Sequence, residues 1–401
     1  MSTTPFRFAL MGTTALGAAV LVACGGGGSD PAPAAPVSTL GTLAVSMTDA
    51  PACGFDAVNV TVSKVRVHRS DTAAEGDTGW TDITLSPAKK VNLLNLTNGV
   101  LEALGQTSLE AGRYTQLRLV LDSAANANTV VPTGSTAEQP LVTPSGLQSG
   151  IKLVGQFDVA AGQKSDVVLD FDACKSVVTR GQGSYALKPV VKVVPAAING
   201  ISGFVSTSLL GRGVQVSAQQ NGAIVSATTP NATTGEFFLS RLAPGNYDVV
   251  ITAADSAASV VAAVPVATTT STTALSTAAA PLMLAPGNTG SIAGTVTMTP
   301  ASSEAAYVSA KQSFTSGPTV TIKYQGADLS TGAYTLANLP VAAPQYATYS
   351  ATLPLAFSAS AATTPGKYRV EAAATSYAVK AVDGVDITTA NQSGVNFSLT
   401  P

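Results

Sequence analysis

The sequence predicts an all-β chain that folds as three consecutive β modules behind an N-terminal export segment. Short alternating apolar runs recur between turn residues, whereas amphipathic helical runs are scarce. Its 36 Gly and 23 Pro supply many turns. Charged residues make up 11% of the chain, against roughly a quarter in typical soluble domains. This composition argues against nucleic-acid binding and against a polybasic membrane patch.

The first 23 residues have the three parts of a secretory signal peptide. Arg7 gives a thin positive region, an apolar run extends from Phe8 to Val22, and small residues precede Cys24. The run is short and rich in Gly and Thr, which disfavours a membrane span. Removal of residues 1–23 leaves 378 of the 401 residues, with 20 basic and 23 acidic side chains.

The sequence Leu-Val-Ala-Cys at 21–24 resembles the lipobox of bacterial lipoproteins. The resemblance implies cleavage before Cys24, acylation of its thiol and of the new amino terminus, and several acyl chains that anchor the protein. Residues 24–38 then form the lipidated cysteine and a flexible, proline-stiffened tether. Because Gly25 stands where many inner-membrane lipoproteins have Asp, we expect the outer membrane of a Gram-negative bacterium, on its periplasmic or surface face.

Cys53 and Cys174 are the remaining cysteines. In an oxidising compartment they form an even pair, which predicts a disulfide that closes a loop of about 120 residues. Two free buried thiols are the alternative.

The first module is expected over residues 39–195. Val58, Val60 and Val62 share one face of a strand, but Val65 and Val67 have the opposite parity, so we predict a bulge near residues 63–64. Residues 91–96 suggest a short strand and residues 100–104 one helical turn.

The clearest strand of this module follows Tyr114. Its predicted inward residues are Leu117, Leu119 and Leu121, and its predicted outward residues are Gln116, Arg118 and Asp122. Pro189 favours an edge position for the last strand, at 185–194.

Four segments of this module carry a family resemblance: Ser-Met-Thr-Asp-Ala-Pro at 46–51, the strand at 60–68, Leu-Leu-Asn-Leu at 93–96, and Gly-Arg-Tyr-Thr-Gln-Leu-Arg-Leu at 112–119. Together they resemble the bacterial domain of unknown function 4382. That resemblance implies an exported protein and brings no catalytic residues.

Residues 199–286 and 289–401 look like diverged copies of one unit. The segment at 201–205 matches 292–296, and the segment at 234–239 matches 331–336. The segment at 242–249 matches two pieces, 339–340 and 365–370, which an apolar insertion at 341–363 separates. The shared order G-x-V, T-G-x-[FY]-x-L and L-x-P-G-x-Y resembles carboxypeptidase-regulatory-like domains. This implies transthyretin-like or starch-binding-like sandwiches of seven strands, and hence three β-sandwich-like modules in all.

Catalytic and metal sites find little support. His68 is the sole histidine and alternates with Lys64 and Arg66, so we expect a solvated strand face instead of a catalytic triad. The candidate calcium ligands are Asp166, Asp170 and Asp172, which share one strand face. The alternative for these three carboxylates is a plain solvated face.

Trp80 is the candidate ligand contact. It follows a polar, glycine-rich turn, where an exposed indole would stack on a sugar ring while Asp77 and Asp82 accept hydroxyl hydrogen bonds. Packing of Trp80 against the core is the alternative. For Tyr324 and Tyr334 the same two interpretations remain, a ligand contact or core packing, and core packing is favoured for Tyr334.

These observations favour a monomeric, non-enzymatic envelope protein without a cofactor. We expect it to display β-sandwich binding modules that recognise a glycan or an envelope protein. The alternative is a structural spacer or assembly factor in an envelope complex.

Overall fold

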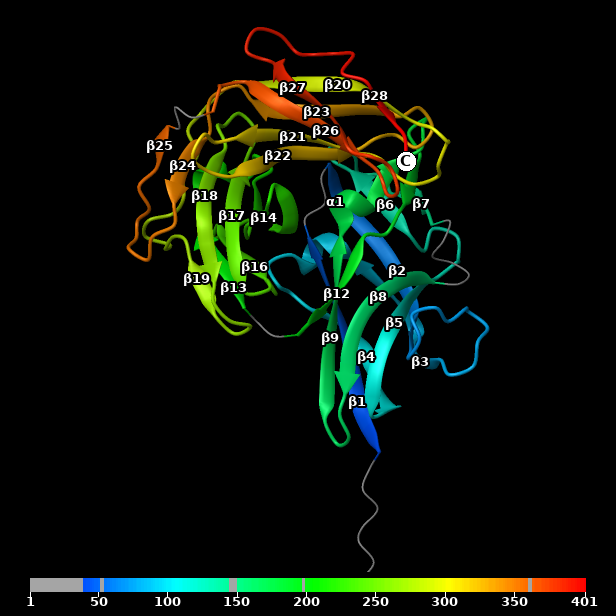
Figure 1. The fold of residues 1–401 in the computed structure, drawn as a ribbon. Helices are drawn as coiled ribbons and strands as arrows, with labels where there is room; N and C mark the ends of the chain where they lie inside the picture. Colours follow the sequence, from blue (N-terminus) through cyan, green and yellow to red (C-terminus); the bar gives the residue numbers. More distant parts are fainter. Residues whose placement is uncertain (1–38, 51–53, 144–149, 197–198, 360–362) are drawn as a thin grey trace, which may run out of the picture. The chain divides into compact units, whose positions relative to one another are not determined.

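The computed structural model describes residues 39–50, 54–143, 150–196, 199–359 and 363–401, and these residues are nearly all in strands and turns (Figure 1). Contacts divide the chain into residues 1–38 and a second unit, Thr39–Pro401, which contains all the described elements. Within that unit three β modules follow one another in sequence order, which confirms the predicted all-β architecture.

The first module consists of two sheets. Its strands are β1 (Leu40–Ala50), β2 (Phe55–His68), β3 (Thr81–Asn92), β4 (Glu102–Glu110), β5 (Gly112–Leu121), β6 (Thr129–Pro132), β7 (Gln139–Val142), β8 (Ile151–Val159), β9 (Lys164–Asp172), β10 (Val177–Thr179), β11 (Tyr185–Leu187) and β12 (Val191–Pro195). One sheet has the order β12-β9-β1-β4, and the other the order β10-β11-β7-β6-β2-β5-β8 with β3 paired to β2. A single apolar core lies between them.

The predicted bulge in this module is confirmed. The pairing register of β2 shifts between Val62 and Lys64, against both β3 and β5. This bulge turns Val65 and Val67 into the same core as Val62, and all three are fully buried. The predicted edge strand at 185–194 is wrong in extent: Pro189 lies between β11 and β12, which belong to different sheets, and only β12 lies at a sheet edge.

Two local predictions are wrong. Residues Leu93–Leu96 form a 3₁₀ helix, η1, because the Asn92 side chain caps it by accepting the Leu94 N–H at 3.2 Å. Residues 102–110 form β4 instead of a helical turn, because they pair along β1 from Leu40 opposite Glu110. Pairing with a neighbouring strand outweighs the weak local preference of a short apolar run.

The second and third modules share one topology. The second contains β13 (Gly200–Phe204), η2 (Thr207–Leu209), β14 (Gln215–Gln220), β15 (Ala223–Thr228), β16 (Glu236–Ser240), β17 (Gly245–Thr252), β18 (Ser259–Val266) and β19 (Thr272–Ala274). The third contains β20 (Thr289–Met298), β21 (Tyr307–Ser313), β22 (Thr319–Gly326), β23 (Ala333–Pro340), β24 (Gln345–Thr348), β25 (Ser358–Ala359), β26 (Lys367–Ala373), β27 (Lys380–Asp386) and β28 (Phe397–Leu399). The order β16-β13-β19 in one corresponds to β23-β20-β28 in the other, and β15-β14-β17-β18 to β22-β21-β26-β27.

Equivalent residues of the two modules make equivalent contacts. Gly235 and Gly332 both have positive φ, and a Cβ on either would lie 2.2 Å from a backbone oxygen, so these turns require glycine. The buried Tyr247 donates its hydroxyl to Ala243 O at 2.7 Å, and Tyr368 donates to Pro340 O at 2.5 Å. The insertion therefore leaves the tyrosine contact of the repeated unit intact.

The inserted segment of the third module joins a sheet of the second module. Its strand β24 pairs in parallel with β18 of the second module, and β25 pairs with β24, as Figure 1 shows beside β18. The third module's core also includes Val250, Ala258 and Val260 of the second module. The two modules consequently share a sheet and part of a core.

Candidate functional site

The loop between β2 and β3 folds back over the outer face of the sheet. Two side chains predicted to point into solvent, Gln116 and Arg118 on β5, lie beneath it and are 0% and 7% exposed. Both donate to Ala73 O, at 3.3 Å from Gln116 and 3.0 Å from Arg118. The alternation along β5 agrees with the prediction, but the expected exposure of these two residues is wrong because the loop covers them.

Trp80 lies at the end of this loop among cationic groups. The guanidinium carbons of Arg66 and Arg118 lie 4.9 and 5.1 Å from the centre of its ring system, and the His68 ring centroid lies at 5.0 Å. Its indole N–H donates to Ala74 O at 2.9 Å. The half-buried indole thus stabilises the loop through cation–π contacts and one hydrogen bond.

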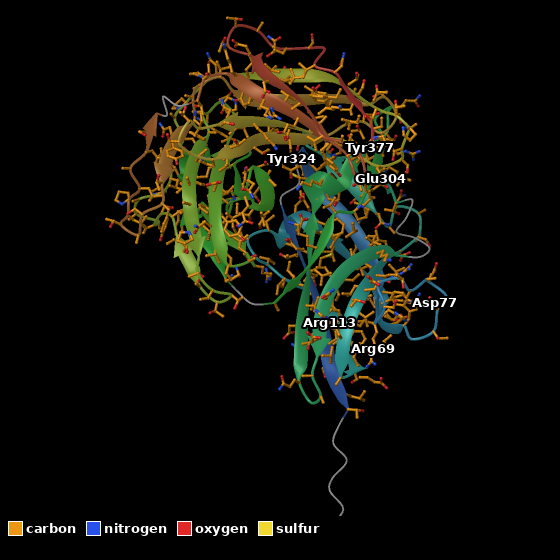
Figure 2. The ribbon with its side chains drawn as sticks, viewed as in Figure 1. Arg69, Asp77, Arg113, Glu304, Tyr324 and Tyr377 are labelled. Atoms are coloured by element: carbon orange, nitrogen blue, oxygen red, sulfur yellow. The ribbon has the colours of Figure 1, made fainter. Side chains whose placement is uncertain are left out.

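The two predicted acidic partners of Trp80 lie on the same loop and strand. Asp77, labelled in Figure 2, accepts the backbone N–H of Ala74 at 2.8 Å. Asp82 pairs with Arg66 at 2.9 Å and with Lys64 at 3.0 Å. Partial burial of Asp82 opposes ionisation, but the hydrogen bonds and positive charges of Arg66 and Lys64 outweigh it and lower the pKa. The three residues are close in the chain and in space, and each already makes a protein contact.

His68 joins the two ends of this loop. Its Nδ1 accepts the Ser70 N–H at 2.9 Å, and its Nε2 lies 3.0 Å from Thr78 O, an arrangement that suits the neutral tautomer with hydrogen on Nε2. The ring therefore positions the loop, a role that the sequence pattern did not indicate.

The three aspartates of β9 do not come together as calcium ligands. Among the described residues no group of three or more metal-ligating side chains is assembled. Asp166 pairs with Lys164 at 2.7 Å, and Asp172 caps α1 (Ala173–Ser176) by accepting the Lys175 N–H at 3.0 Å. Burial raises the pKa of Asp170 to about 6, although the positive charge of Lys192 partly offsets this. The three carboxylates thus have different surroundings, and the calcium candidate gains no support from them.

The tyrosines of the third module have structural roles. Tyr334 is 3% exposed and donates to Val395 O at 2.6 Å. Tyr324, labelled in Figure 2, faces the first module, with the Lys175 ammonium 5.2 Å from its ring centre. Burial, followed by the negative charge of Asp172, raises the pKa of Tyr324 far above its ordinary value. Nearby, Tyr307 donates to Lys175 O at 2.5 Å.

Cys174 on α1 is a disulfide-bonded cysteine. Cys24 and Cys53 both lie outside the described residues, so the pairing of Cys53 with Cys174 stays a prediction. The parallel register of β1 and β9 ends with Ala50 opposite Asp172. These partners are three residues before Cys53 and two before Cys174, a separation along the chain that is compatible with a bond.

Polar side chains that link the modules were not identified from the sequence. Gln219 of β14 is fully buried and makes two 2.8 Å hydrogen bonds with the backbone of Thr321 on β22. The Thr321 hydroxyl donates to Gly222 O at 2.7 Å. Between the first two modules, Asn98 accepts the Thr228 hydroxyl at 2.8 Å and the Phe238 N–H at 3.1 Å. A single glutamine or asparagine in a polar segment carries no signal of such a contact.

Residues 40–189 match the family model described as "Domain of unknown function (DUF4382)". The match covers the first module and confirms the resemblance found in its sequence. No curated protein matches the chain. Among the described residues, no helix has both the length and the apolar character needed to cross a membrane.

Several solved structures match this chain at low similarity. The Bacillus anthracis TIE protein is 11% identical, with 90% of this chain and 50% of that one covered and a TM-score of 0.17. This chain thus spans about half of its length. BcpA, the major pilin subunit of Bacillus cereus, is 13% identical over 90% of this chain and 99% of its own, with a TM-score of 0.17. The Corynebacterium diphtheriae major pilin SpaA is 14% identical over 90% of this chain and 100% of its own, with a TM-score of 0.19. TM-scores of this size do not establish a common architecture.

Proposed function

We propose that this protein is a non-enzymatic, lipid-anchored scaffold of the bacterial cell envelope. The observation that carries the proposal is the sheet shared by the second and third modules, in which β24 pairs with β18. A strand that the third module adds to the sheet of the second, together with the buried Gln219–Thr321 contact, resists bending at the junction. Such a unit is suited to hold a surface at a fixed geometry beyond a flexible tether.

The anchor in this proposal is Cys24, within the lipobox-like sequence at 21–24. Acyl chains on Cys24 would hold the protein at the outer membrane, and residues 25–38 would separate the folded modules from the lipid surface. Carboxypeptidase-regulatory-like modules fit a display role, and the repeated topology of the second and third modules supports that assignment.

The test is membrane fractionation of cells that express the full chain. Cys24→Ser should move the protein from the membrane to the soluble fraction, whereas Cys174→Ser, which removes a cysteine outside the lipobox, should leave it in the membrane. Retention of Cys24→Ser in the membrane would overturn the proposed anchor.

Glycan recognition at the Trp80 loop is a second candidate function. Its support is the partly exposed indole beside the exposed Asp77 carboxylate. We would screen a glycan array with the soluble chain from Gly25 to Pro401 and repeat any hit with Trp80→Ala. A hit that survives this substitution would exclude the loop, and a blank array would leave the structural role of spacer or assembly factor as the better account.

A further inference from the structure

A cavity of about 790 Å³ lies where residues of all three modules meet. Its size falls within the range of roughly 300–1,000 Å³ that is usual for small-molecule sites. The first module contributes residues near the start of β2, the second contributes the loop at 210–214, and the third contributes part of β22. No residue of the predicted Trp80 site lines it.

Most of the cavity wall is apolar. The larger apolar side chains in the lining are Phe55, Leu94, Leu210, Val214, Ile322 and Pro340. Each lies only partly exposed or buried at the wall. A ligand with an apolar body would therefore remove both its own surface and that of these side chains from water.

The charge in the lining is mainly positive. Lys323 on β22 is partly buried, and none of the described residues forms an ion pair or a hydrogen bond with its ammonium group. Burial lowers the pKa of Lys323. Arg212, on an exposed loop, adds a second cation, while the carboxylate in the lining, that of Asp56, accepts the Gly134 N–H at 3.3 Å.

These features narrow the ligand class. A partly buried ammonium without a counter-ion is unfavourable, so a bound anion would relieve the cost of its desolvation. Two cations do not match the charge of a polyphosphate, and the apolar walls do not suit a neutral sugar, which needs many hydrogen-bond partners. A single carboxylate attached to an apolar body matches both the positive charge of the lining and its apolar walls.

We propose that this cavity binds a small amphipathic carboxylate, with its carboxylate at Lys323 and its apolar chain against the walls from Phe55 to Pro340. The site depends on the meeting of the three modules and is independent of the lipid anchor. Binding would stabilise the junction, because the ligand contacts side chains from every module.

The probe is sodium decanoate, titrated below its micellar range at pH 8 into the soluble chain from Gly25 to Pro401 by isothermal calorimetry. We expect saturable binding at one site and a rise in melting temperature. Decanol, which has the same chain without the charge, should bind at least about tenfold more weakly, since a charge-assisted hydrogen bond is lost.

Lys323→Met keeps an unbranched apolar side chain but removes the charge. We expect it to weaken decanoate binding at least about tenfold and to leave decanol binding unchanged. Lys380→Met, on the exposed strand β27 away from the cavity, is the matched control and should bind as the unmodified chain does. Arg212→Ala, on an exposed loop where folding is little affected, should give a smaller loss and serves if Lys323→Met fails to fold.

Three results would overturn the proposal. They are the absence of saturable decanoate binding, equal affinity for decanoate and decanol, and decanoate binding that Lys323→Met and Arg212→Ala both leave unchanged.

Discussion

Replacement of Gln219 by Ala tests the rigid junction between the second and third modules. The Gln219 amide is fully buried, and it both donates to Thr321 O and accepts from Thr321 N at 2.8 Å. Truncation leaves these two backbone groups buried without partners, at about 1–3 kcal/mol each. It also leaves a void. We therefore expect the free energy of unfolding to fall by about 2–6 kcal/mol.

The assay is urea denaturation with scanning calorimetry of the soluble chain. Because Thr321 links the modules, Gln219→Ala should also separate one unfolding transition of the joined modules into two. Gln220→Ala is the matched control: Gln220 is the next residue on β14, and its side chain donates at 3.2 Å to Asn246 O within its own module. We expect the control to cost less than about 1 kcal/mol and to leave the transition unsplit. Equal effects of the two substitutions, or a loss below about 1 kcal/mol for Gln219→Ala, would refute the argument.

Three further predictions concern the other sites. Trp80→Ala should cost about 2–3 kcal/mol through lost burial and cation–π contacts, and should open the loop at 69–80 to proteolysis; unchanged protease resistance would contradict this. Asp170→Asn should raise stability at pH 7, because folding raises the pKa of Asp170 from about 3.8 to about 6. Between these two pH values the folded state binds more protons than the unfolded state, so the stability of the unmodified chain falls as pH rises through about 4–6, by at most about 3 kcal/mol. Urea titrations from pH 4 to 7 should therefore show the unmodified chain and Asp170→Asn converging in stability at the acid end. Mass mapping without reductant should recover Cys53 and Cys174 in one linked peptide pair, worth about 4–5 kcal/mol on the chain-entropy model, and two alkylatable thiols would exclude the bond.

Sequence patterns predicted features that depend on a strand's own alternation. The parity change between Val62 and Val65 located the bulge of β2, because apolar residues on either side of it must face one core. Repeated turn motifs likewise identified the second and third modules as copies of one unit.

Features that depend on distant segments could not be predicted in this way. Gln116 and Arg118 alternate as outward residues should, and only the loop from another strand pair buries them. The apolar insertion at 341–363 gave no sign that β24 would join a different module's sheet. Asp166, Asp170 and Asp172 share a strand face, but their separate partners arise from α1, β12 and β9 itself. Periodicity defines which face a side chain lies on, whereas tertiary contacts define what covers that face.

Mass spectrometry of the membrane-extracted protein tests the central claim most directly. The account predicts a mature chain that begins at Cys24, lacks residues 1–23, and carries acyl groups on the first residue. A mature chain with an unmodified Cys24, or one that begins at another residue, would contradict the lipid-anchored scaffold.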